Sequence, residues 1–292
     1  MAGPTRALVE RHGGKRTAYD AALLDVAQDH LLYLLASAGA FEGGDLVLKG
    51  GTSLRKCRLG NRGRFSTDLD FAAPSEDTVI EVCGLIDGRS VGGFEFRLET
   101  TRGDGRHWTL TVSHAELGVP AIGASVEFAR RPLALPPERL GFVELPIHGH
   151  YGFELPELPV IAEEEACAEK LARYRRASHT RDLYDLWQLS ARRLDRGLVR
   201  RLWVLKVWAD VNDDDRGIKP LTSDDVLRER AAAAFANDSI GALTRPFDIE
   251  SWELTVRQRF AFLADLDADE TRWASCSERD RYEVMAALAA FR

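Results

Sequence analysis

The sequence predicts an α+β fold, in which a unit built around a β-sheet is followed by a helical bundle. Between Asp45 and Ile147, short apolar runs alternate with polar residues in several places, as they do in half-buried strands. After Ile161, apolar residues recur at helical spacing as far as the end of the chain. The chain has 292 residues, of which 45% are hydrophobic, so it is long enough to form two hydrophobic cores. We expect the two parts to meet near residues 155–162.

The first part begins with an expected helix over 17–39, because apolar residues recur there at helical spacing before a glycine-containing loop. Five apolar runs predict strands: 46–48, 68–73, 94–98, 108–112 and 124–128. A helix at 76–86 is expected to interrupt them. The segment 131–160 contains six prolines and is therefore expected to wrap or link without regular structure.

The second part is expected to be entirely helical. Its periodic segments predict six helices: 162–177, 180–193, 196–211, 222–234, 250–268 and 277–291. Four hydroxyl side chains stand where N-caps are expected: Thr180, Ser223, Ser251 and Ser277. This part also holds five of the six tryptophans, whose spacing favours packing in a core over a platform for stacking nucleobases.

Composition excludes several classes of protein. With 39 Lys and Arg against 46 Asp and Glu, the net charge is −7, so any site for a polyanion must be a local patch. The four cysteines form no CxxC pair, which argues against a structural zinc and a disulfide framework. The longest apolar run, 284–291, is too short to span a membrane, and no apolar segment of a secretory signal follows the basic start. We therefore expect a cytoplasmic protein with no membrane partner.

The most informative stretch is 46–73, which starts with a strand that runs into Gly50-Gly51-Thr52-Ser53 and a helix. Paired glycines let a backbone turn sharply and approach a ligand closely. The amides and hydroxyls of Thr52 and Ser53 would then face outward at a helix N-terminus, which favours phosphate oxygens. Taken alone, the motif is better explained by a plain tight turn, because short Gly-Gly strand ends are common.

The same stretch ends in Asp68-Leu69-Asp70, an acidic pair on an expected strand. Side chains alternate along a strand, so both carboxylates share one face. Two close carboxylates repel each other unless a cation lies between them, and Mg²⁺ prefers such oxygen ligands together with water and phosphate oxygens. The alternative is an acidic pair that is merely solvated at a strand end.

Two further features favour a functional site. Between Asp45 and Asp68 there is no acid but five bases, which predict either a local patch for a polyanion or a solvated loop: Arg55, Lys56, Arg58, Arg62 and Arg64. Glu127 lies on a later expected strand, where a third carboxylate could complete a two-metal site. The alternative for Glu127 is a glutamate that faces outward from an edge.

These motifs resemble a known family. A strand followed by Gly-Gly, an Asp-x-Asp pair and a later strand acid resembles the DNA polymerase β-type nucleotidyltransferases. More narrowly, four motifs resemble the AbiEii/AbiGii toxins of bacterial AbiE-type toxin–antitoxin and phage-defence systems: KGGTSL (49–54), FSTDLDF (65–71), AEKLAR (168–173) and RDLYDLW (181–187). The last third of the chain, 188–292, matches this family only in being helical.

The resemblance implies a domain organisation and a set of site residues. A helical segment over 1–40 would pack on a mixed-sheet nucleotidyltransferase core over 41–160, and the helical domain 161–292 would contribute Lys170 and Asp185. Asp68 and Asp70 would bind Mg²⁺, with Glu127 as a doubtful third ligand. The nucleotide would be bound by residues of the first, second and third motifs: Lys49, Gly50, Gly51, Thr52, Ser53, Ser66 and Lys170. Ser66 could instead be a regulatory hydroxyl.

The resemblance also implies an activity. In MenT-like members, a nucleoside monophosphate is transferred from an NTP to the 3′ end of tRNA, which blocks aminoacylation and hence translation. The implied partners are an NTP, tRNA or another RNA acceptor, and a cognate AbiEi-like antitoxin. Two alternatives stay open: an acceptor hydroxyl on a small molecule or protein, or a catalytically silent nucleotide-binding module. The intact acidic pair argues against the silent module.

The residues of the later motifs can also be interpreted without the family. Lys170 lies on an expected helix whose apolar face holds Cys167, Leu171 and Tyr174, and a lysine there is usually solvated. Asp182 and Asp185 are three residues apart, hence on one helix face. Asp182 falls in the first turn, where an acid stabilises the helix dipole, so we expect it to be structural and Asp185 to be functional.

Overall fold

The computed structural model describes all residues except 1–2, 16, 101–102, 236–242, 244–245 and 292. The chain divides into two compact units. The first comprises 1–132, 137–161 and 240–246, and the second comprises 133–136, 162–239 and 247–292. In the part of the chain that is described, no helix is long and apolar enough to cross a membrane.

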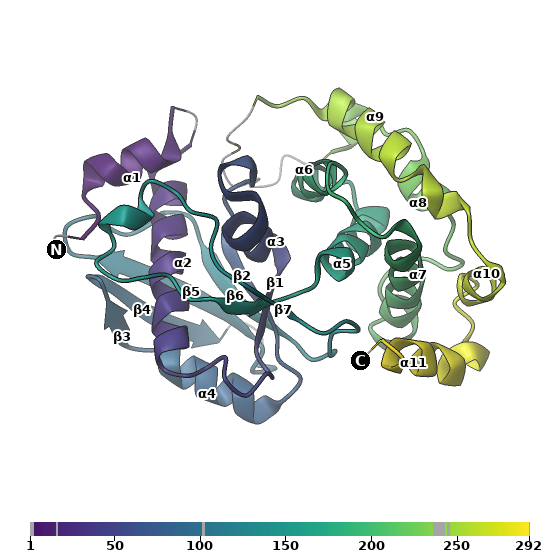
Figure 1. The fold of residues 1–292 in the computed structure, drawn as a ribbon, viewed down its shortest axis with the longest axis horizontal. Coiled ribbons are helices and arrows are strands. Elements are labelled where there is room, and N and C mark those ends of the chain that lie inside the picture. Colours follow the sequence, from purple (N-terminus) through teal and green to yellow (C-terminus); the bar gives the residue numbers. More distant parts are fainter. Residues whose placement is uncertain (1–2, 16, 101–102, 236–242, 244–245, 292) are drawn as a thin grey trace. The chain divides into compact units, whose positions relative to one another are not determined.

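The first unit is built on an eight-stranded mixed sheet (Figure 1). Its strands are β1 (Val47–Lys49), β2 (Asp68–Ala72), β3 (Arg89–Val91), β4 (Phe94–Thr100), β5 (His107–His114), β6 (Ala124–Ala129), β7 (Glu138–Leu140) and β8 (Leu158–Val160). They lie in the order β3-β4-β5-β6-β2-β1-β8-β7. The pairs β2–β6 and β1–β8 are parallel and the other pairs are antiparallel. The predicted α+β class with a mixed sheet is therefore confirmed.

The helices of this unit are α1 (Arg6–Gly13), α2 (Tyr19–Ser37), α3 (Gly50–Leu54) and α4 (Glu76–Ile86). In Figure 1, α2 crosses the sheet, and α1 packs against α2. Most of α2 is buried, including three polar residues on one side: Asp25, Gln28 and Asp29. Such residues are rarely buried without polar or charged partners, so other segments of this unit must supply partners for them.

The second unit is helical, as predicted. Its helices are α5 (Glu163–Arg176), α6 (Thr180–Leu189), α7 (Arg196–Asp213), α8 (Asp224–Leu227), α9 (Ile249–Arg259), α10 (Ala268–Trp273) and α11 (Arg281–Ala289). α7 packs against α5, and α6 packs against α9. Four tryptophans are buried in this unit, which confirms the predicted core packing: Trp203, Trp208, Trp252 and Trp273.

Several predicted elements need correction. The proline-rich segment 131–160 contains β7, β8 and a short 3₁₀ turn, so the expectation of no regular structure is wrong. The helix expected at 222–234 is limited to α8, and beyond it Arg230 donates hydrogen bonds to the backbone oxygens of Asp225 and Tyr174. The helix expected at 250–268 ends at Arg259.

Two of the four expected N-cap residues, Ser223 and Ser277, stand at an N-cap position, and the other two do not. Only Ser277 accepts a backbone N–H with its side chain, in the 3₁₀ turn before α11. Asp248 caps α9, and Ser251 lies inside that helix. Thr180 is the first residue of α6, and Ser223 makes no capping hydrogen bond with its side chain. At α9, a carboxylate and a hydroxyl that could each cap the helix lie three residues apart, at Asp248 and Ser251. Only the side chain that directly precedes the first helical turn can accept a hydrogen bond from the backbone N–H groups of that turn.

Candidate functional site

The glycine turn, which we define as Gly50 and Gly51, directly follows β1 and begins α3, and Gly50 lies against Asp70 of the acidic pair. Gly50 has φ +72°, a conformation that glycine adopts without strain. A Cβ atom at Gly50 would lie 1.9 Å from Oδ2 of Asp70. Only a glycine therefore allows the Asp70 carboxylate to occupy its place beside the turn.

The register of the sheet places further side chains around the pair. β2 runs between β1 and β6, so Asp70 is opposite Lys49 on one side and Glu127 on the other, while Asp68 is opposite Ser125. Asp68 and Asp70 alternate with buried neighbours and share one face of β2, as the spacing predicted. The Ser125 hydroxyl lies 3.1 Å from Oδ1 of Asp68 and donates to it.

The hydroxyls directly after the turn are used within the fold. Thr52 donates from Oγ1 to the backbone oxygen of Asp68 at 2.5 Å, and Ser53 donates from Oγ to the backbone oxygen of Gly50 at 2.9 Å. Both residues are buried. The expectation that these hydroxyls face outward is therefore wrong: Thr52 joins the end of the turn to the acidic strand, and Ser53 bonds back to the turn.

Arg64, which the sequence indicated only as one of five bases in the run, is a candidate site residue. A Cβ atom at Gly51 would lie 2.4 Å from Nη2 of Arg64 and 3.1 Å from Oγ of Ser66. The guanidinium and the Ser66 hydroxyl thus lie beside the backbone of the turn, where a guanidinium can bind phosphate oxygens in a bidentate manner. The signal was present in the sequence, since Arg64 stands directly before the second motif.

Three other bases of the run are not part of a surface patch, whereas Arg62 is exposed. Arg55 and Lys56 are buried and form ion pairs with carboxylates of α2. Arg58 donates to the backbone oxygen of Ile161 and pairs with Glu138. The predicted patch or solvated loop is therefore wrong for these three cations, whose role is internal.

Glu127 is placed beside a histidine. Its carboxylate is about half exposed, and its Oε2 lies 4.0 Å from Nε2 of His107, whose Nδ1 lies 2.7 Å from Oδ2 of Asp104. Among the described residues, no group of three or more His, Cys, Asp or Glu side chains is arranged to hold a metal ion. A metal-binding role for Glu127 stays a prediction.

The all-oxygen donors of Asp68 and Asp70 fit a hard divalent cation that also takes water and substrate phosphate as ligands. Both carboxylates share a strand face, and Asp70 touches the glycine turn that would receive the phosphates. The residues present are therefore compatible with a Mg²⁺ site completed by a nucleotide.

In the second unit, Lys170 on α5 is buried between two carboxylates of α6. Its Nζ lies 2.7 Å from Oδ2 of Asp185 and 3.3 Å from Oδ1 of Asp182. Arg173 also pairs with Asp182, at 3.1 Å. The two aspartates thus share a helix face, as predicted, but the usual solvated position of a lysine is wrong for Lys170. Asp182 bridges two cations, which agrees with a structural role.

Comparison with known proteins places the chain in a family. Residues 33–279 match the family model described as nucleotidyl transferase AbiEii toxin, type IV toxin–antitoxin system. MenT4, a nucleotidyltransferase toxin from Mycobacterium tuberculosis H37Rv, is 67% identical with a TM-score of 0.97, over 99% of this chain and 100% of that one.

Two structures from Helicobacter pylori are more distant. One, described as a nucleotidyltransferase, is 18% identical with a TM-score of 0.46, over 85% of this chain and 96% of that one. The other, JHP933, is 15% identical with a TM-score of 0.46, over 92% of this chain and 98% of that one. No curated protein sequence matches significantly. The motifs, the fold and the family model agree, and the chain belongs to the AbiEii nucleotidyltransferase toxin family of type IV toxin–antitoxin systems.

Proposed function

We propose that this nucleotidyltransferase toxin transfers a nucleoside monophosphate from an NTP to an RNA acceptor, the 3′ end of tRNA, and so blocks translation. The observation that carries the proposal is the contact of Asp70 with Gly50. It places the carboxylate pair beside the glycine turn, whose backbone could bind the phosphates of a nucleotide. An acidic protein has little general affinity for RNA, so we assign recognition of the acceptor to local features.

In the proposed reaction, the acceptor hydroxyl oxygen forms a bond to the α-phosphorus and its proton passes to water, while the bond from the α-phosphorus to the oxygen that bridges it to the β-phosphorus breaks and pyrophosphate leaves. Asp68 and Asp70 would hold Mg²⁺, which when bound stabilises charge on the attacking and leaving oxygens. The backbone amides of the glycine turn and the Arg64 guanidinium would bind the triphosphate. Lys49 and Ser66, which flank the acidic pair and the turn, would support this binding.

We further propose that Lys170 contacts the nucleotide phosphates and that Asp185 completes the site. The family motifs support this assignment, and so does the 2.7 Å contact, in which a carboxylate fixes the position of the lysine amine. A buried cation aimed by a carboxylate can stabilise developing phosphate charge without reorganising. Membership of a type IV system supports a cognate antitoxin as partner.

The test is incorporation of each of four labelled NTPs in the presence of Mg²⁺, with total tRNA, cell protein and a small-molecule fraction offered as acceptors. We expect label in tRNA from the wild type and a loss of at least about 100-fold in Asp70→Asn. Glu95→Gln, an exposed acid on β4 of the same sheet, is the matched control and should transfer normally. Wild-type transfer by Asp70→Asn would refute the site.

The acceptor is tested by the same experiment. Label in the protein or small-molecule fraction, with none in tRNA, would replace the RNA acceptor by one of the two alternatives. No label in any fraction, with NTP still bound, would indicate the silent module.

A further inference from the structure

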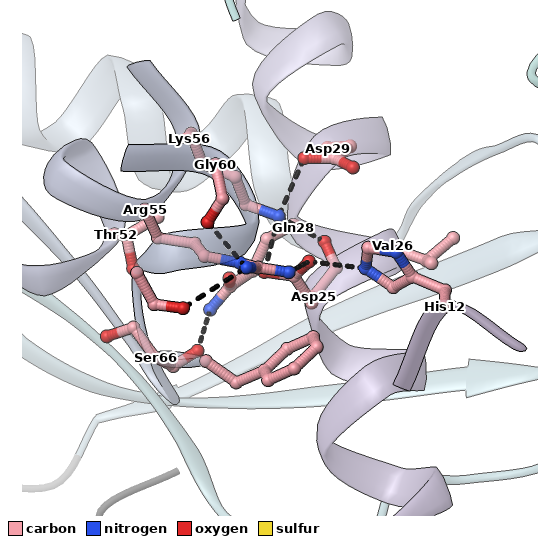
Figure 2. A network of polar contacts seen from close by, with 12 residues as sticks. His12, Asp25, Val26, Gln28, Asp29, Thr52, Arg55, Lys56, Gly60 and Ser66 are labelled. Carbon is pink, nitrogen blue, oxygen red and sulfur yellow. Dashed lines mark hydrogen bonds and ion pairs between the residues drawn. The ribbon is translucent and has the colours of Figure 1, made fainter. Parts of the chain in front are cut away.

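A buried ion network lies between α2 and the segment that follows the glycine turn (Figure 2). We define this network as His12, Asp25, Asp29, Arg55 and Lys56. Nε2 of His12 lies 2.7 Å from Asp25, Nη2 of Arg55 lies 3.3 Å from Asp25, and Nζ of Lys56 lies 2.7 Å from both aspartates. The side chains of all five are almost inaccessible to solvent. The network therefore joins α1 and α2 to the residues directly after α3.

Arg55 extends the network toward the acidic strand. Its Nη1 donates to the backbone oxygens of Gly60, at 2.7 Å, and Gly63, at 3.2 Å. Its guanidinium also lies over the ring of Phe65, 4.1 Å from the centroid. One buried side chain thus fixes three points of the segment 60–66, which connects the turn to β2.

Gln28 fixes the end of that segment. It lies on α2, three residues after Asp25, and its Nε2 donates to the backbone oxygen of Ser66 at 2.9 Å, a bond drawn in Figure 2. Ser66 is two residues before Asp68, and its hydroxyl lies beside Gly51. Through Gln28, α2 therefore holds Ser66, which lies beside the glycine turn and shortly before the acidic pair.

Stability alone does not explain why charges are buried here. Replacing a buried ion pair by apolar side chains of similar volume is often neutral or stabilising, whereas paired ions impose one geometry on the groups they join. The residues Arg55–Leu59 also form a π-helical turn, a rare conformation that is frequent at functional sites. Both observations point to a role in fixing geometry.

We propose that Gln28 and the Asp25–Arg55 pair are positioning residues for nucleotidyl transfer. They hold the segment 60–66 so that the glycine turn and the Asp68–Asp70 pair keep one fixed separation. This inference rests on the proposed function and adds to it residues that touch neither nucleotide nor metal. A displacement of about 1 Å at a reacting centre can lower a rate by roughly 100-fold, so small shifts of this segment must be costly.

The test compares Gln28→Met, which keeps the length and volume but removes the donor, with Tyr151→Phe. Tyr151 donates to Oδ2 of Asp29 at 2.6 Å, so the control also removes one buried hydrogen bond to the network, but at a point away from 60–66. Amide hydrogen exchange over 60–66 and kcat and KM for NTP are measured well below the unfolding temperature. We expect Gln28→Met to exchange faster over 60–66 and to lose at least 10-fold in kcat, and Tyr151→Phe to change neither by more than 2-fold.

The proposal is overturned if Gln28→Met keeps wild-type kcat, or if the two variants lose activity in proportion to their loss of stability. Gln28→Asn, which keeps the amide but shortens its reach, serves if Gln28→Met does not fold, and the same losses are expected. Hydrogen exchange does not depend on catalysis. If the wild type transfers no nucleotide, the proposed function fails; if the wild type is active and Gln28 is dispensable, only the positioning role fails.

Discussion

Replacing Gly50 by alanine should disable the enzyme with little effect on its fold. The new Cβ would lie 1.9 Å from Oδ2 of Asp70, whereas such contacts are essentially never shorter than 3.0 Å, so the carboxylate must move by roughly 1 Å. A shift of that size at a metal-binding carboxylate should lower kcat/KM by about 100-fold. Because the φ at this position is +72°, alanine there should also lower the stability of the protein by about 1–2 kcal/mol.

Gly44→Ala separates the two effects. Gly44 has φ +76° in the same unit, and apart from its chain neighbours no atom of the described residues lies within 4 Å of a Cβ placed there. In thermal or urea unfolding, Gly44→Ala should show the cost of the positive φ alone, and Gly50→Ala should show that cost together with the cost of the collision with Asp70. Only Gly50→Ala should lose nucleotide incorporation. If the rate of nucleotide incorporation by Gly50→Ala stays within 2-fold of that by Gly44→Ala, the contact between Gly50 and Asp70 is not needed for activity.

Three further predictions concern the buried charges and thiols. Lys170→Met should destabilise the protein by about 3–5 kcal/mol in urea unfolding, because it removes a cation that is paired with two buried carboxylates. Lys170→Met/Asp185→Leu should regain stability but not activity, and full activity of the double variant would contradict the assignment. Burial raises the pKa of Asp25, but the paired cations and histidine lower it by more, so its folded pKa is well below the ordinary value. The ionised Asp25 therefore stabilises the fold above about pH 4, and this stabilisation is lost as the pH falls below that value. When the free energy of unfolding is measured at decreasing pH, the difference between the wild type and Asp25→Asn should shrink. Burial raises the pKa of Cys57 to about 12 and of Cys83 to about 11, so neither should react with a thiol reagent at pH 7.5 in the folded state; rapid labelling before unfolding would refute this.

Local pattern was sufficient to predict the central part of the site. The alternation in β2 placed both aspartates on one face, because the side-chain period of a strand is two. The glycine pair predicted the turn, because few residues other than glycine adopt a positive φ readily. These features depend on neighbours in sequence, so they can be read from a single chain.

Features that depend on distant pairing could not be predicted in this way. β8 is a three-residue strand that exists because Val160 pairs with Leu48, more than a hundred residues earlier. Arg55 and Lys56 look like surface bases in sequence, since their partners on α2 lie about thirty residues before them. A run of bases therefore indicates charge, and only the tertiary fold decides whether that charge faces solvent or a buried acid.

The close fit at Gly50 has a consequence for genetics. Every missense change at a glycine codon adds at least a methyl group, and here even a methyl group collides with Asp70. Cells forced to express this toxin without its antitoxin should therefore acquire resistance readily through single-base changes in that codon. Sequencing of such survivors should find intact, full-length alleles altered at this position.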